Sequence, residues 1–288
     1  MLSISQKDIE NYRTKTFHLL SRFHLHNERD AIKFVNECGF AFFWPVKNAL
    51  LPSLWNATVG DRPVPDNHDD PGHITWRWKD NLLGKKKLYY ARVLRKRNTF
   101  IALSILPNFY TLSPNYGDPE NDYLLQYKEG LLSIEAKSVY EVILSQGPLD
   151  TLSLKRASML SSPGNESRFN RALDKLQADF RLLPVGIAEA GTWHYAFIYD
   201  AVHRHFPELI NISRNISENV ARQTLLQKYM KTVGACQIYE PQRIFQWGQT
   251  ELELSLNELI KSGTISKAQF QSEDKSIWIV HKDLFQLD

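Results

Sequence analysis

The middle of the chain distributes apolar and polar positions in a way that predicts consecutive helices. Apolar side chains recur at helical spacing from Ala136 to Ile143, and the Gly147–Pro148 pair ends this segment. Thr151 is the expected N-cap of a second helix, "LSLKRASML", which stops at the breaker-rich "SSPGN". The segment "ESRFNRALDKLQADF" predicts a third helix, whose apolar stripe consists of Phe169, Leu173, Leu176 and Phe180.

After the third helix, the pattern changes to that of strands. The runs "RLLPVGIAE" and "WHYAFIYD" are short and β-prone, and "AGT" between them places Gly191 in a turn. Helix, turn, helix, helix and hairpin is the element order of a winged helix-turn-helix. We therefore expect one such unit in residues 135–207.

The carboxy-terminal part repeats this pattern. Residues 172–183, "ALDKLQADFRLL", align with residues 255–266, "SLNELIKSGTIS", without a gap. Ser217 and Gly234 are the expected caps of a long preceding helix, and Pro241 falls in the first turn of a short one. The repeat predicts a second winged helix in residues 217–288 and a chain that is mainly α with small β-hairpins, an α+β fold.

Composition narrows the class of protein. The 288 residues are 43% hydrophobic and 23% charged, which is typical of a globular chain with a sizeable core. The longest apolar runs fall well short of the ~20 residues of a membrane span, and no secretory signal pattern begins the sequence. Cys38 and Cys236 lack the spacing of a zinc site or a disulfide framework. We expect a cytoplasmic monomer without membrane contact and without a cofactor.

The net charge of +3 is small, but its distribution is uneven. Residues 85–97, "KKKLYYARVLRKR", hold seven Lys or Arg, no acidic residue and two tyrosines. A solvated charged face explains such a run on its own. Basic residues mixed with aromatic ones are equally what a surface following a phosphate backbone requires.

Two further segments carry chemistry-bearing residues. In "DNHDDPGH", the side chains of His68, Asp69, Asp70 and His73 are of types that bind divalent metals. The surrounding residues form turns, so we expect a solvated loop and no metal site. In the following "HITWRWKD", Trp76 and Trp78 are two positions apart, and this alternation predicts one face of a half-buried strand. With the basic residues 85–97, the two rings could equally form one wall of a basic groove with aromatic anchors.

In the order of its predicted elements and in several short segments, the chain resembles the AlkZ/YcaQ group of winged-helix DNA glycosylases. The resemblance rests on "RFNRALDKLQADFRLL", "AGTWHYAFIYDAVHRHFP" and "EPQRIFQWGQTELELSLNELIKSGTI", and on "AIKFVNECGFAFFWPVKNALLPSLW" near the amino end. It implies tandem winged helices and removal of alkylated or crosslinked bases from DNA. It also implies that the helix-rich residues 1–130 form a third, split winged helix containing the basic, β-containing segment.

The catalytic motif of that family is where this sequence departs from it. The family has glutamine, any residue, then glutamine or aspartate; aligned on Gly39 and on Pro45-Val46, these polar positions fall on Phe42 and Trp44. Neither ring carries the oxygen that orients water or stabilises a sugar cation. We therefore expect no catalytic residue at these positions, and interpret the rings first as core behind a helix over residues 46–55 and second as a platform for a base.

The sequence accordingly predicts a protein that binds double-stranded DNA, damaged DNA included, and lacks the catalytic residues of its relatives. The residues expected to face DNA are cationic or lie on the wing: Lys85, Lys86, Lys87, Arg92, Arg95, Arg97, Arg168, Arg171, Lys175 and His194. Two alternatives stay open. One is an active glycosylase that activates water through Glu37 or Asn48, and the other is a set of winged helices that bind protein.

Overall fold

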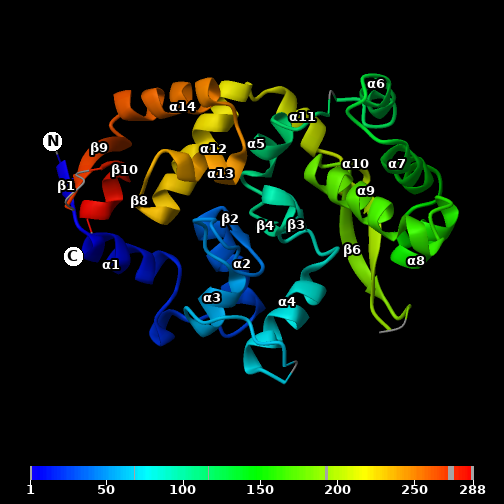
Figure 1. Cartoon of the computed structure of the whole chain (residues 1–288), viewed down its shortest axis with the longest axis horizontal. Helices are drawn as coiled ribbons and strands as arrows, with labels where there is room; N and C mark the ends of the chain where they lie inside the picture. The colour runs from blue at the N-terminus through cyan, green and yellow to red at the C-terminus, as the bar shows by residue number, and fades with distance from the viewer. Residues whose placement is uncertain (1, 68, 116, 192–193, 272–275, 287–288) are drawn as a thin grey trace.

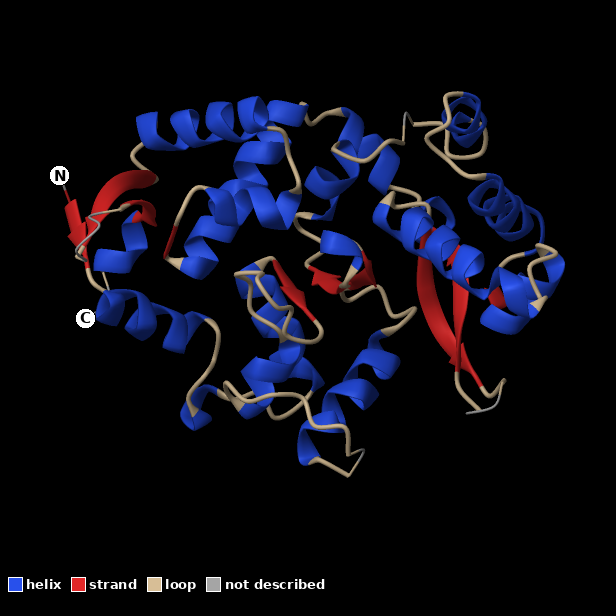
Figure 2. Cartoon of the chain, in the orientation of Figure 1, coloured by secondary structure: helices blue, strands red, loops and turns tan. Residues whose placement is uncertain are grey.

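The computed structural model describes residues 2–67, 69–115, 117–191, 194–271 and 276–286. Within them the chain is an α+β protein in which helices predominate and the strands form three small sheets (Figure 2), as the sequence predicts. The sheets have the strand orders β1-β9-β10-β8, β2-β4-β3 and β5-β7-β6. None of the described helices is both long and apolar enough to cross a membrane.

The middle region contains the predicted helices and hairpin. The predicted helices are α7 (Ile134–Gln146), α8 (Thr151–Ala157) and α9 (Glu166–Ala178), and they follow α6 (Asp122–Lys128), which the sequence did not predict. The strands β6 (Leu182–Ala188) and β7 (Ala196–Ala201) pair antiparallel, and β5 (Leu149–Asp150) adds to the other edge of β7. Residues 192–193 of the connecting turn lie outside the described residues.

Two local predictions for this region were wrong. The N-cap of α8 is Asp150, whose side chain accepts hydrogen bonds from the amides of Leu152 and Ser153, and Thr151 is the first helical residue. An ionised carboxylate at this position satisfies two unpaired amides and also interacts favourably with the helix dipole. Phe180 lies beyond the end of α9, in a left-handed conformation with φ of 56°, yet it is buried in the core.

The carboxy-terminal region follows α10 (Val202–His205) and α11 (Leu209–Arg214). Its elements are α12 (Glu218–Val233), β8 (Ala235–Cys236), α13 (Tyr239–Phe245), α14 (Gln249–Lys261), β9 (Ile265–Phe270) and β10 (Ile277–His281). The predicted caps of α12 are confirmed, with the Ser217 side chain accepting from the amide of Val220 and Gly234 at φ of 76°. The chain start belongs spatially to this region, because β1 (Leu2–Ile4) pairs parallel with β9 and α1 (Gln6–Thr16) packs on α12. Figure 1 shows both at the end of the molecule that holds β9 and β10.

The remaining amino-terminal elements are the strands of the β2-β4-β3 sheet, called the central sheet below, and the helices from the same part of the chain. They are α2 (Glu28–Cys38), β2 (Phe40–Phe42), α3 (Leu54–Val59), α4 (Ile74–Leu82), β3 (Tyr89–Arg92), β4 (Asn98–Ile101) and α5 (Leu106–Thr111). The helix expected over residues 46–55 starts only at Leu54, where the Ser53 side chain caps it. The basic segment supplies the exposed loop before β3, β3 itself and the turn into β4.

The strand predicted from Trp76 and Trp78 is helix α4 instead. Its buried positions are Thr75, Trp78, Lys79 and Leu82, which is helical spacing, while Trp76 is 38% exposed. Two of these buried residues, Thr75 and Lys79, are polar. The apolar residues alone therefore do not show the helical spacing, and the two tryptophans produce the alternation of a strand.

One hydrophobic core joins the three regions. It includes Phe40 and Tyr89 from the central sheet, Phe180 from the end of α9, and Leu225 and Leu256 from α12 and α14. The central sheet is thereby held against both α9 and the carboxy-terminal helices. The limits 1–130, 135–207 and 217–288 of the regions stay predictions.

Candidate nucleic-acid interface

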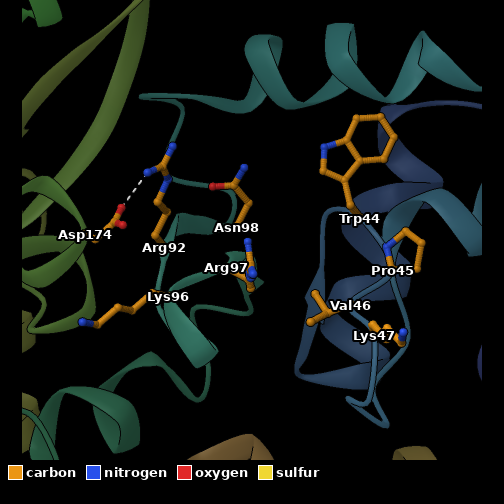
Figure 3. Close-up of a pocket in the computed structure, with 9 residues that line it drawn as sticks. All are labelled: Trp44, Pro45, Val46, Lys47, Arg92, Lys96, Arg97, Asn98 and Asp174. Atoms are coloured by element: carbon orange, nitrogen blue, oxygen red, sulfur yellow. Dashed lines mark hydrogen bonds and ion pairs between the residues drawn. The ribbon is translucent and has the colours of Figure 1, made fainter. Parts of the chain in front are cut away.

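Two adjoining pockets open where the central sheet faces α9 and the β6–β7 hairpin. Each has a volume of about 480 Å³. The polar compartment (Figure 3) is lined by Trp44, Pro45, Val46, Lys47, Arg92, Lys96, Arg97, Asn98 and Asp174. The aromatic compartment is lined by Phe43, Trp44, Trp76, Lys79, Tyr90, Arg92, Asn98, Tyr195 and Phe197. Trp44, Arg92 and Asn98 line both, so the two compartments are continuous.

The two aromatic residues at the positions aligned with the family motif have different surroundings, because Phe42 is the last residue of β2 and Trp44 follows the strand. Phe42 is fully buried at 0% exposure in the core, opposite Thr99 of β4. Trp44 lies past the end of β2, partly exposed, and its ring lines both compartments. The amide of Phe43 donates to the carbonyl of Asn98 at 2.9 Å, which fixes the two chain segments that carry Trp44 and Asn98 next to each other. Phe42 is thus core packing, while Trp44 is available to a ligand.

Arg92 lies at the junction of the compartments and is held from α9. Its Nη1 lies 2.5 Å from Oδ1 of Asp174, and its backbone amide donates to the Gln177 side chain at 3.2 Å. Burial opposes the charge of Arg92, but the hydrogen bond and the charge of Asp174 outweigh burial and raise the pKa of the guanidinium. A permanent cation therefore lies between the two compartments.

Lys79 forms one wall of the aromatic compartment and is only 1% exposed. Its Nζ donates to the Tyr195 hydroxyl at 2.5 Å and lies 2.8 Å from Oδ1 of Asp80, and the Tyr195 hydroxyl donates to the same carboxylate at 2.8 Å. The Nζ also lies 4.6 Å from the ring centroid of Trp76 and 4.7 Å from that of Phe197. Burial lowers the pKa of Lys79, against the effect of Asp80. Carboxylate and ring faces together are the surroundings of an ammonium ion.

This Lys79–Tyr195–Asp80 network ties α4 to the β6–β7 hairpin. Burial and the hydrogen bond to Asp80 raise the pKa of Tyr195, so its hydroxyl keeps the proton it donates. The ring of Tyr195 lies 6.1 Å from Trp76 and 5.6 Å from Phe197. The hairpin thus closes one side of the aromatic compartment.

The cationic residues predicted from the sequence fall into separate groups. Arg92 and Arg97 line the polar compartment, and Lys85, Lys86 and Lys87 are exposed in the loop before β3. Arg95 points elsewhere, since its Nη1 donates to the backbone carbonyl of Asn48 at 2.9 Å. His194 is exposed near the tip of the hairpin.

The α9 cations line a different pocket from the two compartments. Arg168, Arg171 and Lys175 share a cavity of about 580 Å³ with the turn before α7. Arg168 lies 3.7 Å from Glu135, and Lys175 lies 2.8 Å from Asp179. Burial raises the pKa of Asp179, while Lys175 and Lys96 act in the opposite direction. Asp179 is thus paired with Lys175 and lines neither this pocket nor the polar compartment.

Several lining residues were not among the sequence candidates. Lys96 belongs to the basic run but was not selected, and Lys47, Lys79, Asn98 and Tyr195 carried no local signal for this role. Strand pairing and the packing of the hairpin on α4 bring them together.

The proposed water-activating residues lie away from the compartments. Glu37 is exposed on α2 beside Lys33 at 3.7 Å, and Asn48 lines a pocket with Arg95 and α13. Neither is among the residues that line the polar or aromatic compartment.

In the loop before α4, which was considered as a metal site, the Asp70 carboxylate forms hydrogen bonds within the protein. Both carboxylate oxygens of Asp70 bind Arg62, at 2.7 and 2.9 Å, and Oδ1 also accepts from the Gly72 amide. His68 lies outside the described residues. Across the residues that are described, no three His, Cys, Asp or Glu side chains are grouped so as to hold a metal ion.

Comparison with known proteins identifies relatives of the fold. The model of a family described as AlkZ related matches residues 25–246. Among solved structures, the Streptomyces sahachiroi DNA glycosylase AlkZ superposes with a TM-score of 0.61 at 10% sequence identity, over 99% of this chain and 72% of that chain. None of the curated proteins matches the chain.

Proposed function

The chain belongs to the AlkZ-related family, and on this premise we propose that it binds double-stranded DNA and accepts one extruded nucleotide without cleaving its glycosidic bond. The regions 135–207 and 217–288 serve as winged helices in this proposal, with residues 1–130 as a third, split unit. The observation that carries the proposal is that the aromatic compartment and the polar compartment share the lining residues Trp44, Arg92 and Asn98.

The aromatic compartment suits a base. Its volume of about 480 Å³ lies within the range of ligand pockets, and its walls are the rings of Phe43, Trp44, Trp76, Tyr90 and other residues. A base extruded from a duplex gains roughly 1–3 kcal/mol from each aromatic ring on which it stacks. That gain offsets the few kcal/mol that unstacking from the duplex costs.

The polar compartment suits the phosphates on either side of that base. The side chains of Lys47, Lys96 and Arg97 line it, and none of them has an ion-pair partner among the described residues. Cations without carboxylate partners are free to replace the counterions of a phosphate backbone. The α9 cations and Lys85, Lys86 and Lys87 extend this basic character beyond the compartment.

The motif positions explain why the proposal stops short of catalysis. Phe42 is sealed in the core, and Trp44 presents an indole ring where hydrolysis requires an oxygen that orients water. Stacking stabilises the extruded base in the bound state, whereas only interactions that strengthen in the transition state speed bond cleavage.

Fluorescence anisotropy with two labelled duplexes tests the proposal. One duplex is fully paired, and the other contains a single unpaired base opposite an abasic analogue. We expect tighter binding of the second, and Trp44→Ala should remove roughly 1–3 kcal/mol of this preference. Phe285→Ala, at a 47% exposed ring distant in sequence from the compartments, is the matched control. Absence of duplex binding at about 50 mM salt would overturn the proposal.

An active glycosylase is the second candidate, and one observation favours it. Asp174 supplies a carboxylate to the polar compartment, and carboxylates are the usual groups that activate water or stabilise an oxocarbenium ion. In this structure the carboxylate of Asp174 is instead paired with the guanidinium of Arg92. Alkali-induced strand breaks in alkylated DNA that disappear in Asp174→Asn would establish this second function in place of the first.

A further inference from the structure

The residues that line the aromatic compartment carry charge of one sign only. Lys79 and Arg92 line it, and none of its lining residues that the structure describes is acidic. The nearby carboxylates are already engaged, Asp80 with Lys79 and Tyr195, and Asp174 with Arg92. The lining therefore contains two cations and no carboxylate, and the carboxylate partner of each cation does not line this compartment.

The aromatic rings of the compartment do not make it a site for a cationic base. Aromatic faces attract cations, which by itself would favour a positively charged base. In this compartment the ring faces already hold one cation, because the Lys79 Nζ lies 4.6 Å from the centroid of Trp76, 4.7 Å from Phe197 and 5.1 Å from Tyr195. A second cation beside Lys79 and Arg92 would be repelled, and juxtaposed like charges that exclude water are strongly unfavourable.

A neutral hydrogen-bonding group completes the compartment. The Asn98 carboxamide makes no hydrogen bond to the residues that the structure describes, and Figure 3 shows it facing the same space as the Trp44 ring. The Trp44 indole N–H is likewise without a protein partner in the described chain. A carboxamide offers a donor and an acceptor side by side, which matches the edge of a neutral base that has both.

We propose that the aromatic compartment selects an extruded base that carries no positive charge, stacked on Trp44 and read at its edge by Asn98. This inference rests on the proposed function and adds the chemical class of the base. It separates this chain from activity on purines alkylated at N3 or N7, whose rings are cationic. Neutral bases, whether unmodified or bearing a neutral lesion, are the ligands it names.

The test uses two duplexes that differ only in the charge of one base. One contains N7-methylguanine, which is cationic, and the other contains its neutral 7-deaza isostere with the same methyl group, each opposite an abasic analogue. We expect anisotropy titrations to show at least about tenfold tighter binding of the neutral base. Equal affinity, or tighter binding of the cationic base, would overturn the inference.

Variants at Asn98 separate charge from hydrogen bonding. Asn98→Asp adds a carboxylate of the same shape and should reduce or reverse the preference for the neutral base, whereas Asn98→Leu should weaken binding of the neutral base and leave the order intact. Asn257→Asp, at an exposed position of α14, brings the same charge change elsewhere and should alter neither. If Asn98→Asp behaves as Asn257→Asp does, the residue does not face the base and the inference is wrong.

The outcomes distinguish the inference from the proposed function. Loss of binding to every duplex contradicts the proposed function itself. Tighter binding of duplexes with an unpaired base, without discrimination by charge, leaves the proposed function standing and removes only the selection of a neutral base.

Discussion

If the proposed function holds, the salt dependence of DNA binding measures how many cations of the polar compartment contact phosphates. Lys96 and Arg97 are exposed, line that compartment and have no ion-pair partner among the described residues. The double variant Lys96→Gln with Arg97→Gln removes both charges and keeps side chains of similar length. Arg92 is left intact, because its charge is already paired with Asp174.

The expected size of the effect follows from counterion release. Each phosphate contact contributes about −0.9 to the slope of log K against log salt, so losing two contacts should make the slope shallower by about 1.8. Between about 50 and 200 mM salt, each contact changes affinity by roughly threefold to fourfold, and two together by roughly tenfold. Anisotropy titrations with one labelled duplex over this range give the slope.

A matched control distinguishes a local contact from a loss of net charge. Lys7 on α1 and Lys267 on β9 are exposed and lie at the end of the molecule that holds both chain termini (Figure 1), so Lys7→Gln with Lys267→Gln lowers the net charge equally. This control should keep the slope of the unmodified chain. The reasoning is refuted if the two double variants have the same slope, because phosphates would then not occupy the polar compartment.

Two further predictions concern stability. Lys79→Ala removes the cation beside Asp80 and leaves the hydrogen bond from Tyr195 to Asp80, so the free energy of unfolding in denaturant should fall by about 3 kcal/mol, near the lower end for a broken buried pair. Lys79→Met fills the same space with an apolar side chain and should cost less than Lys79→Ala. A larger loss of stability in Lys79→Met would contradict this. Burial lowers the pKa of His203 and His281, so the unfolded chain binds more protons below about pH 6.5, and the melting temperature should be fully maintained above that pH and fall as the pH decreases through the folded-state pKa values. A melting temperature that rises on acidification from about pH 7 to 5 would contradict this sign.

Local patterns predicted the elements whose determinants lie close together in the sequence. The caps Ser217 and Gly234 define α12, and the apolar stripe of α9 is confirmed up to Leu176. Phe180 and α4 show the limit of such patterns. In α4, Lys79 is buried because Tyr195, far along the chain, supplies its partner, and no local rule places a lysine in a core stripe.

The candidate site was predictable only in part for the same reason. The basic run and Trp44 were recognised from the sequence because their composition is distinctive. Asn98 was not, since its place beside Trp44 follows from the pairing of β2 with β4. The guanidinium of Arg95 donates to the backbone carbonyl of Asn48, a contact that the sequence does not indicate.

Under the proposed function, the residues that line the two compartments account for binding of a nucleotide without cleavage of its glycosidic bond. A catalytic site must lower the energy of a transition state, which in glycosidic hydrolysis is a developing sugar cation, and cations nearby work against it. Here the cations Lys79 and Arg92 border the space beside Trp44, and the carboxylates close to them are paired. Under the proposed function, these lining cations disfavour that transition state and tolerate a neutral stacked base. Under the proposed function, the aromatic side chains at Phe42 and Trp44 are consistent with these lining charges, because both favour holding a nucleotide over breaking its bond.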